Sequence, residues 1–172
     1  LRERDRRWEA TRALLRAHDL ECLLVYGYKS HDHYDCYLTN EQLDGTVVFP
    51  LDGEPIAFTA LTQRLARRLA TNLTGPEFWL DDIRVGRYGP QTVAVLKELG
   101  LERARIGVMG LDSWGPGEFD GLVPYRMWQT VLDGLPDARF VDVSVHFKKN
   151  MLRKSEEEIA LYRYSGQVGD LA

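Results

Sequence analysis

Apolar residues recur at helical spacing near the start of the chain and then gather in short runs. One face of a 3.6-residue period carries Trp8, Thr11, Leu14, Leu15 and His18. This spacing predicts an amphipathic helix over residues 4–18, whose arginines and acids are expected to form a solvated face. Residues 21–26 are a short apolar run ended by Gly27, which is typical of a buried strand. Residues 36–39 are predicted as a second short strand.

A hairpin is predicted around Asp52-Gly53, because apolar runs at residues 45–49 and 56–59 flank it. Asp-Gly favours a two-residue type I′ turn, in which both central residues adopt positive φ. Such a turn places Pro50 opposite Pro55, with their missing N–H groups on the side away from the partner strand. The two prolines are therefore compatible with the hairpin.

The rest of the chain alternates between helical and strand-like patterns. Residues 61–69 suggest a short basic helix, 78–85 a short strand with a loop, 90–99 a helix ended by Gly100, 105–109 a strand, 124–135 a helix and 140–143 a strand. Helices that separate several strands favour an α/β fold, a three-layer α/β/α sandwich with a mixed sheet.

A last helix begins at about Glu156, because Ser155 and Glu158 form a capping-box pattern. Its apolar stripe consists of Leu161, Tyr164, Val168 and Leu171. No glycine or proline stop signal follows this stripe before residue 172. The helix either folds back on this domain or packs against a further domain, and we expect the second.

Composition and charge narrow the class of protein. A chain of 172 residues is about one domain, and 44% hydrophobic residues exclude a disordered chain. A net charge of −4 argues against a nucleic-acid partner, and no apolar run approaches the ~18 residues that span a membrane. Cys22 and Cys36 form no C-x-x-C motif, so a reducing cytoplasm is the expected location.

The densest group of possible metal ligands is the stretch at residues 31–35. On an extended strand His31, His33 and Asp35 would share one face, and two histidines with a carboxylate can bind zinc or iron. A polar connection exposed to water explains the same residues better, because metal sites usually draw ligands from distant segments. We therefore predict no metal site in this chain.

Other motifs are also incomplete. Residues 107–110 (GVMG) follow a predicted strand but lack the G-x-G-x-x-G pattern of dinucleotide binding. Ser113 lacks the glycine two positions earlier that a nucleophile elbow requires. We find no convincing catalytic group, so none of the residues is predicted to be catalytic.

Six short segments carry five motifs that resemble, in the right order, those of the creatinase, prolidase and aminopeptidase P family, and the last two segments belong to one motif. They are residues 19–25 (DLECLLV), 37–39 (YLT), 47–55 (VVFPLDGEP), 105–108 (RIGV), 141–144 (VDVS) and 151–161 (MLRKSEEEIAL). The last segment departs from the family pattern, because no residue separates Arg153 from Lys154. The resemblance covers residues 4–172.

This resemblance implies a non-catalytic N-terminal domain with a ribonuclease-H-like fold over residues 1–152. Residues 153–172 would then begin the helix that links it to a C-terminal catalytic domain. In the family, that second domain holds two divalent metal ions (Mn, Co or Zn) on two Asp, one His and two Glu. The implied whole protein is a cytoplasmic, homodimeric Xaa-Pro peptidase that acts on proline-containing peptides, with no nucleic acid or membrane partner.

The resemblance also implies that loops of this domain border a neighbouring active site and select substrate. The candidate residues are His31, His33, Tyr37, Thr39 and Asn40. Asn40 stands where the family has a glycine, and asparagine tolerates the left-handed backbone region best after glycine. The alternatives are a creatinase-like C–N hydrolase, a freestanding binding or assembly module and, third, a nucleotide-binding domain.

Overall fold

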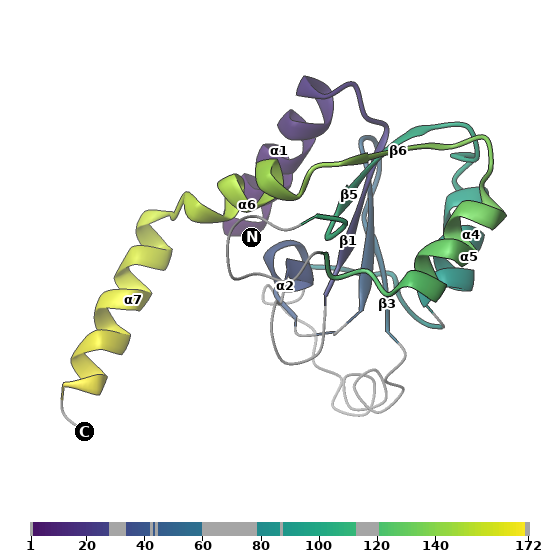
Figure 1. The fold of residues 1–172 in the computed structure, drawn as a ribbon. Coiled ribbons are helices and arrows are strands. Elements are labelled where there is room, and N and C mark those ends of the chain that lie inside the picture. The colour runs from purple at the N-terminus through teal and green to yellow at the C-terminus, as the bar shows by residue number, and fades with distance from the viewer. Residues whose placement is uncertain are drawn as a thin grey trace.

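The computed structural model describes residues 2–27, 34–41, 43, 45–59, 79–86, 88–112 and 121–170, which form a six-stranded sheet with helices on both faces (Figure 1). The elements are α1 (Arg2–Ala17), β1 (Cys22–Tyr26), α2 (Tyr34–Thr39), β2 (Thr46–Pro50), β3 (Ile56–Thr59), β4 (Ile83–Val85), α4 (Tyr88–Glu98), β5 (Arg105–Met109), α5 (Tyr125–Gly134), β6 (Arg139–Asp142), α6 (Ser144–Leu152) and α7 (Glu156–Gly169).

The sheet is mixed, in the order β4-β3-β2-β1-β5-β6. The central strand β1 pairs antiparallel with β2 and parallel with β5. The β2–β3 pair is antiparallel, whereas the β3–β4 and β5–β6 pairs are parallel. The predicted α/β class with a mixed sheet is confirmed.

Two hydrophobic cores lie on opposite faces of this sheet. The α1-side core joins α1, α2 and α6 to the sheet, and it includes Trp8, Leu15, Leu23, Val25, Leu38, Phe49 and Phe147. The α4-side core joins α4 and α5 to the other face, and it includes Leu24, Val48, Phe58, Leu96, Ile106 and Val131. Consecutive residues of β1 alternate between the cores because strand side chains alternate between faces. The predicted three-layer arrangement is therefore confirmed.

The predicted register of the β2–β3 hairpin is wrong by one residue. Val48 pairs with Ile56 and Val47 with Ala57, so each residue of β2 pairs with the β3 residue one position earlier than a two-residue turn at Asp52-Gly53 would give. Opposite residues of antiparallel strands share a face, and each observed pair enters a single core. The predicted register would have set Val48 opposite Ala57, which belong to different cores. Gly53 lies in the connection and adopts a φ of 101°.

The prediction of a strand over residues 36–39 is also wrong, because this segment belongs to helix α2. Tyr34, Tyr37 and Leu38 lie at helical spacing, and all three are buried in the α1-side core. Both edges of β1 are already occupied by β2 and β5, so no neighbouring strand is left for pairing at that position. Tertiary packing therefore overrides the strand propensity of this short sequence.

The remaining predictions have mixed outcomes. Helices α1, α4 and α5 and strands β1, β4, β5 and β6 lie where the patterns placed them, within a few residues. Gly100, with φ of 71°, follows the end of α4 as predicted. Helix α6 was not among the predicted elements. The predicted basic helix at residues 61–69 lies outside the described residues.

Helix α7 leaves the three layers and projects away from them (Figure 1). No residue of this helix is buried, and Leu161, Tyr164 and Val168 of the predicted stripe are exposed. The alternative that the stripe folds back onto this domain is therefore wrong for these three residues, while Leu171 lies outside the described residues. Among the described helices, none is both long and apolar enough to cross a bilayer.

Candidate functional site

The predicted rim residues differ in how the structure places them. Tyr37 and Thr39 are buried in α2, whereas Asn40, directly after this helix, is exposed. Asn40 adopts a φ of 56°, as predicted from its place at the family's glycine. His31 and His33 lie outside the described residues.

Hydrogen bonds hold the turn that presents Asn40. The Thr39 Oγ1 atom lies 2.9 Å from the carbonyl oxygens of both Asp35 and Glu41, and it accepts the Glu41 N–H at 3.1 Å. Thr39 is therefore engaged in closing the turn. Of the described rim candidates, Asn40 alone combines exposure with a left-handed backbone.

The buried carboxylate of Asp35 hydrogen-bonds backbone groups on both sides of this turn. Asp35 is fully buried, and its carboxylate accepts the N–H groups of Cys36 and Gly45 at 3.1 and 3.3 Å. A Cβ atom at Gly27 would collide with the same carboxylate, so this position requires glycine. Asp35 thus lies against Gly27 after β1 and hydrogen-bonds Gly45 before β2, so it holds the start of α2 beside the ends of both strands.

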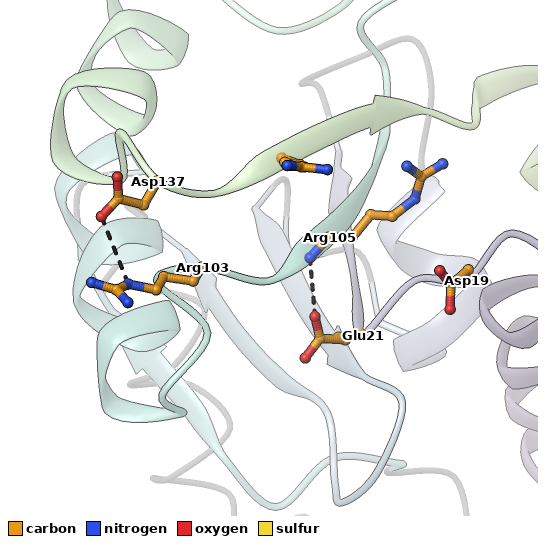
Figure 2. A pocket seen from close by; sticks show the side chains of 6 residues that line it. Asp19, Glu21, Arg103, Arg105 and Asp137 are labelled. Carbon is orange, nitrogen blue, oxygen red and sulfur yellow. Dashed lines mark hydrogen bonds and ion pairs between the residues drawn. The ribbon is translucent and has the colours of Figure 1, made fainter.

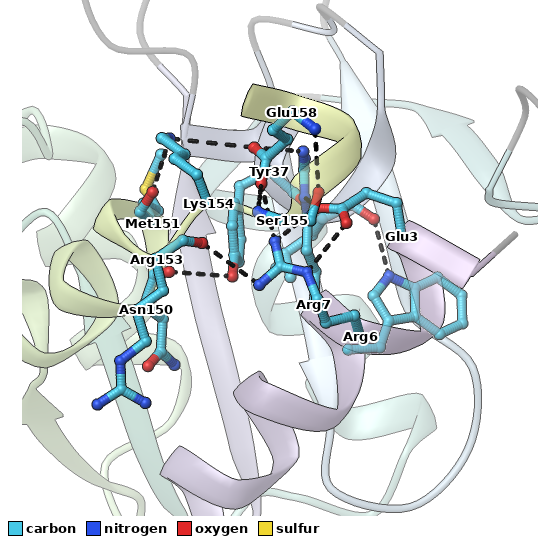
Figure 3. A network of polar contacts seen from close by, with 12 residues as sticks. Glu3, Arg6, Arg7, Tyr37, Asn150, Met151, Arg153, Lys154, Ser155 and Glu158 are labelled. Carbon is cyan, nitrogen blue, oxygen red and sulfur yellow. Dashed lines mark hydrogen bonds and ion pairs between the residues drawn. The ribbon is translucent and has the colours of Figure 1, made fainter. Parts of the chain in front are cut away.

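Tyr37 connects α2 to α1 and α6. Its ring makes an edge contact with Phe147, with centroids 5.5 Å apart, and the Arg7 guanidinium lies 4.9 Å from its centroid. Its hydroxyl donates to the Asn150 carbonyl at 3.4 Å (Figure 3), and the Asn150 amide donates to the Ala10 carbonyl. Burial raises the pKa of Tyr37, so the hydroxyl stays protonated at neutral pH. Through these contacts Tyr37 holds α2 against α1 and α6.

The VDVS segment builds the turn from β6 into α6. Ser144 donates its hydroxyl to Asp142 Oδ1 at 2.6 Å and its N–H to Oδ2 at 3.2 Å. The Ser144 Oγ atom in turn accepts the Gly110 N–H at 2.9 Å. This segment therefore fastens the end of β5 to the start of α6.

The predicted capping box at the start of α7 is confirmed. Ser155 Oγ accepts the Glu158 N–H at 3.1 Å, and the Glu158 carboxylate accepts the Ser155 N–H at 2.9 Å. Together these two segments build the path from the sheet to α7.

An open depression of about 540 Å³ lies at the amino ends of β1, β5 and β6 (Figure 2). Its lining is balanced between three acids and three arginines: Asp19, Glu21, Asp137, Arg103, Arg105 and Arg139. Arg103 pairs with Asp137 at 3.8 Å, and Glu21 accepts the Arg105 N–H at 3.1 Å. Ligands of parallel sheets bind at the carboxyl edge, so this depression lies at the less favourable edge.

Metal-binding and nucleophilic groups are sparse in the part of the chain that the structure describes. There, no group of three or more His, Cys, Asp or Glu side chains is arranged to hold a metal ion. Cys22 is fully buried, and desolvation raises the pKa of its thiol far above the ordinary value. A buried thiol of this kind is chemically inert.

The expectation that the charged residues of α1 form a solvated face is only partly right, because several of them are half-buried. Where α1 meets the start of α7, the side chains of Glu3 and Arg7 are 17% and 14% exposed, and that of Arg6 is half-buried (Figure 3). The i,i+4 spacing of Glu3 and Arg7 was readable from the sequence. Their approach to Glu158 has no local sequence signal, because more than 150 residues separate Arg7 from Glu158.

No family model and no curated protein sequence matches the chain significantly. Solved structures match over most of its length. An Xaa-Pro dipeptidase from Bacillus anthracis superposes with a TM-score of 0.63 and 18% identity, over 91% of this chain and 38% of that protein. The chain thus spans well under half of this relative.

Isolated N-terminal domains match over nearly their whole length. The N-terminal domain of the cytoplasmic peptidase PepQ from Mycobacterium tuberculosis H37Rv has a TM-score of 0.58 and 15% identity, over 84% of this chain and 97% of that domain. A Creatine_N superfamily domain of a Streptococcus thermophilus dipeptidase has a TM-score of 0.56 and 14% identity, over 83% and 96%. The chain therefore has the fold of the creatinase/prolidase N-terminal domain, the type found in Xaa-Pro peptidases.

Proposed function

We propose that this chain is the non-catalytic N-terminal domain of a metal-dependent Xaa-Pro peptidase and that it serves dimerisation and substrate selection. The main support is that this chain matches isolated N-terminal domains over nearly their whole length but covers well under half of a longer peptidase chain. The chain matches 96–97% of two isolated N-terminal domains but 38% of a whole Xaa-Pro dipeptidase. The two divalent ions (Mn, Co or Zn) would then be bound by a C-terminal domain.

The exposed face of α7 supports a further domain or subunit beside this one. Leu161, Tyr164 and Val168 share one face and are each at least 50% exposed on a helix with no buried residue. Exposed apolar clusters of this kind typically mark interaction surfaces. We infer that a catalytic domain or a second subunit buries this face.

The position of Asn40 supports a role in substrate selection. The turn after α2 leads from the carboxyl end of β1 to the start of β2, and this is the edge where α/β sheets bind ligands. A side chain there can border the active site of a neighbouring subunit. It would affect substrate binding and leave the chemical step to the catalytic domain.

The cellular compartment of a matched protein supports a cytoplasmic location. PepQ, one of the matched proteins, is a cytoplasmic peptidase. We propose the same compartment for this chain, where the thiols of Cys22 and Cys36 would stay reduced.

The direct test is an activity assay on the full gene product. We expect the full protein, supplied with Mn, Co or Zn, to hydrolyse Xaa-Pro dipeptides and to elute as a dimer in size-exclusion chromatography with light scattering. Residues 1–172 alone should hydrolyse none. Hydrolysis of creatine in place of Xaa-Pro peptides would instead support the creatinase-like alternative. Peptidase activity in residues 1–172 would contradict the non-catalytic role.

A further inference from the structure

Four charged side chains join α1 to the first turn of α7, and we call Glu3, Arg6, Arg7 and Glu158 the α1–α7 clamp (Figure 3). Arg6 Nη2 donates to one oxygen of Glu158 at 2.9 Å, and Arg7 Nη2 donates to the other at 3.0 Å. Both arginines also donate to Glu3 Oε1 at 2.6 Å. Each arginine therefore bridges a carboxylate of its own helix and the carboxylate of α7.

The clamp is partly shielded from water. The side chains of Arg7 and Glu158 are 14% and 15% exposed, so solvent screens their attraction less than that of a surface pair. Hydrogen bonding from Arg6 is the main cause that lowers the pKa of Glu3 to about 2. With two carboxylates and two guanidiniums, the clamp carries no net formal charge.

Outside the clamp, Lys154 also links α6 to α7, because its Nζ atom donates to the Met151 carbonyl at 2.7 Å and lies 4.0 Å from Glu158 Oε1. No residue of α7 is buried, and the Arg2–Glu157 pair is 4.0 Å long and highly exposed. Residues 153–155, which separate α6 from α7, are not helical. Arg6 adds one bond at this link, since its Nη1 atom donates to the Arg153 carbonyl at 3.3 Å. The same arginine thus restrains both the link and the helix.

We propose that the α1–α7 clamp is an electrostatic latch, which fixes the direction in which α7 leaves the α/β layers. When the Glu158 charge is removed by substitution or is screened by salt, α7 moves about residues 153–155 while the layers stay folded. This conformational device does not depend on the proposed peptidase function. If that function holds, the latch also sets the orientation of whatever domain follows α7.

Nuclear magnetic resonance on the 172-residue chain tests the latch. Residual dipolar couplings report the direction of α7, and backbone order parameters report its motion. The informative variants are Glu158→Gln and Arg6→Gln. Glutamine at residue 158 keeps the capping box while removing the charge. We expect α7 order parameters to fall from about 0.85 to below about 0.6 in both variants, with the sheet unchanged. In wild-type protein at about 1 M NaCl, where the Debye length is ~3 Å, the order parameters of α7 should also fall.

Three further variants separate the latch from other effects. Glu157→Gln and Arg16→Gln change neighbouring exposed charges of the same two helices and should leave the direction of α7 unaltered. Ser155→Ala removes the cap and the hydroxyl that hydrogen-bonds Glu3, but it keeps all four charges of the clamp. The first turn should therefore fray while the direction persists. The proposal is overturned if α7 keeps its direction and order in both Glu158→Gln and Arg6→Gln. It is equally overturned if Ser155→Ala alone releases the helix.

Discussion

The α/β layers and helix α7 are stabilised by different physics. In the layers, strands such as β1 are buried on both faces, and their side chains fill two separate cores. In α7 every residue has solvent contact, and order comes from a cap and from ion pairs at its first turn. The comparison teaches that one chain can contain a segment held by burial and another held almost entirely by polar contacts at one end.

The largest difference in free energy of unfolding is expected when the same substitution, leucine to alanine, is made in each region. Leu23→Ala, at a fully buried position of β1, should lower the free energy of unfolding by about 2–5 kcal/mol, because it leaves a cavity. Leu161→Ala, at a position that is 64% exposed on α7, should change it by less than about 0.5 kcal/mol. Urea denaturation followed by circular dichroism measures both. Similar losses would mean that α7 is packed against the layers.

Glycine substitutions should have opposite signs in the two regions. Gly27→Ala should lower the free energy of unfolding by about 1–3 kcal/mol, since the added methyl collides with the buried Asp35 carboxylate. Gly166→Ala meets open space in α7 and should favour local helix formation by about 0.5–1 kcal/mol. Denaturation measures the first effect, and amide hydrogen exchange in α7 measures the second. A neutral Gly27→Ala would contradict the close approach of Asp35.

The turn at Asn40 should show a smaller effect. Asn40→Ala places a less tolerant residue at a φ of 56° and should cost about 1 kcal/mol, whereas Asn40→Gly should be neutral within about 0.5 kcal/mol. In the full-length protein, we expect both variants to raise KM for an Xaa-Pro dipeptide and to leave kcat unchanged. An unchanged KM in both would remove Asn40 from the proposed substrate rim.

Acid should weaken the clamp with a defined sign. The pKa of Glu3 is lowered from 4.5 to about 2 in the folded chain. A lowered folded-state pKa contributes stability that is present above pH 4.5 and is lost as the pH falls towards 2. At neutral pH we expect the free energy of unfolding of the wild-type protein to be about 1 kcal/mol larger than that of Glu3→Gln. This difference should shrink as the pH falls from 4.5 towards 2. Unfolding free energies measured at several pH values test this. A difference independent of pH would contradict the ion pairing of Glu3.

Most of the fold could be predicted from periodicity. The apolar run of β1, the period of α1 and the cap of α7 are local signals, and all three were confirmed. The strand predicted at residues 36–39 was wrong, because its identity depends on which edges of β1 are already paired. The hairpin register was wrong for a similar reason, since the choice between two registers depends on which core each side chain enters.

The candidate site was less predictable than the fold. The left-handed turn at Asn40 followed from the resemblance. The approach of Arg6 and Arg7 to Glu158 could not be found, because two helices at opposite ends of the chain form it. The burial of Tyr37 was also missed, because its partners Phe147 and Asn150 lie on a helix that was not predicted. Contacts between residues so far apart in the sequence leave no pattern that a single sequence reveals.

The central claim is that this chain is one domain of a larger peptidase. The most direct test is the intact mass of the natural gene product, with its sequence determined beyond Ala172. We predict a mass about twice 19.7 kDa or greater, and an extension that carries two Asp, one His and two Glu in that order. A natural product that ends near Ala172 would contradict the claim and leave a freestanding binding or assembly module.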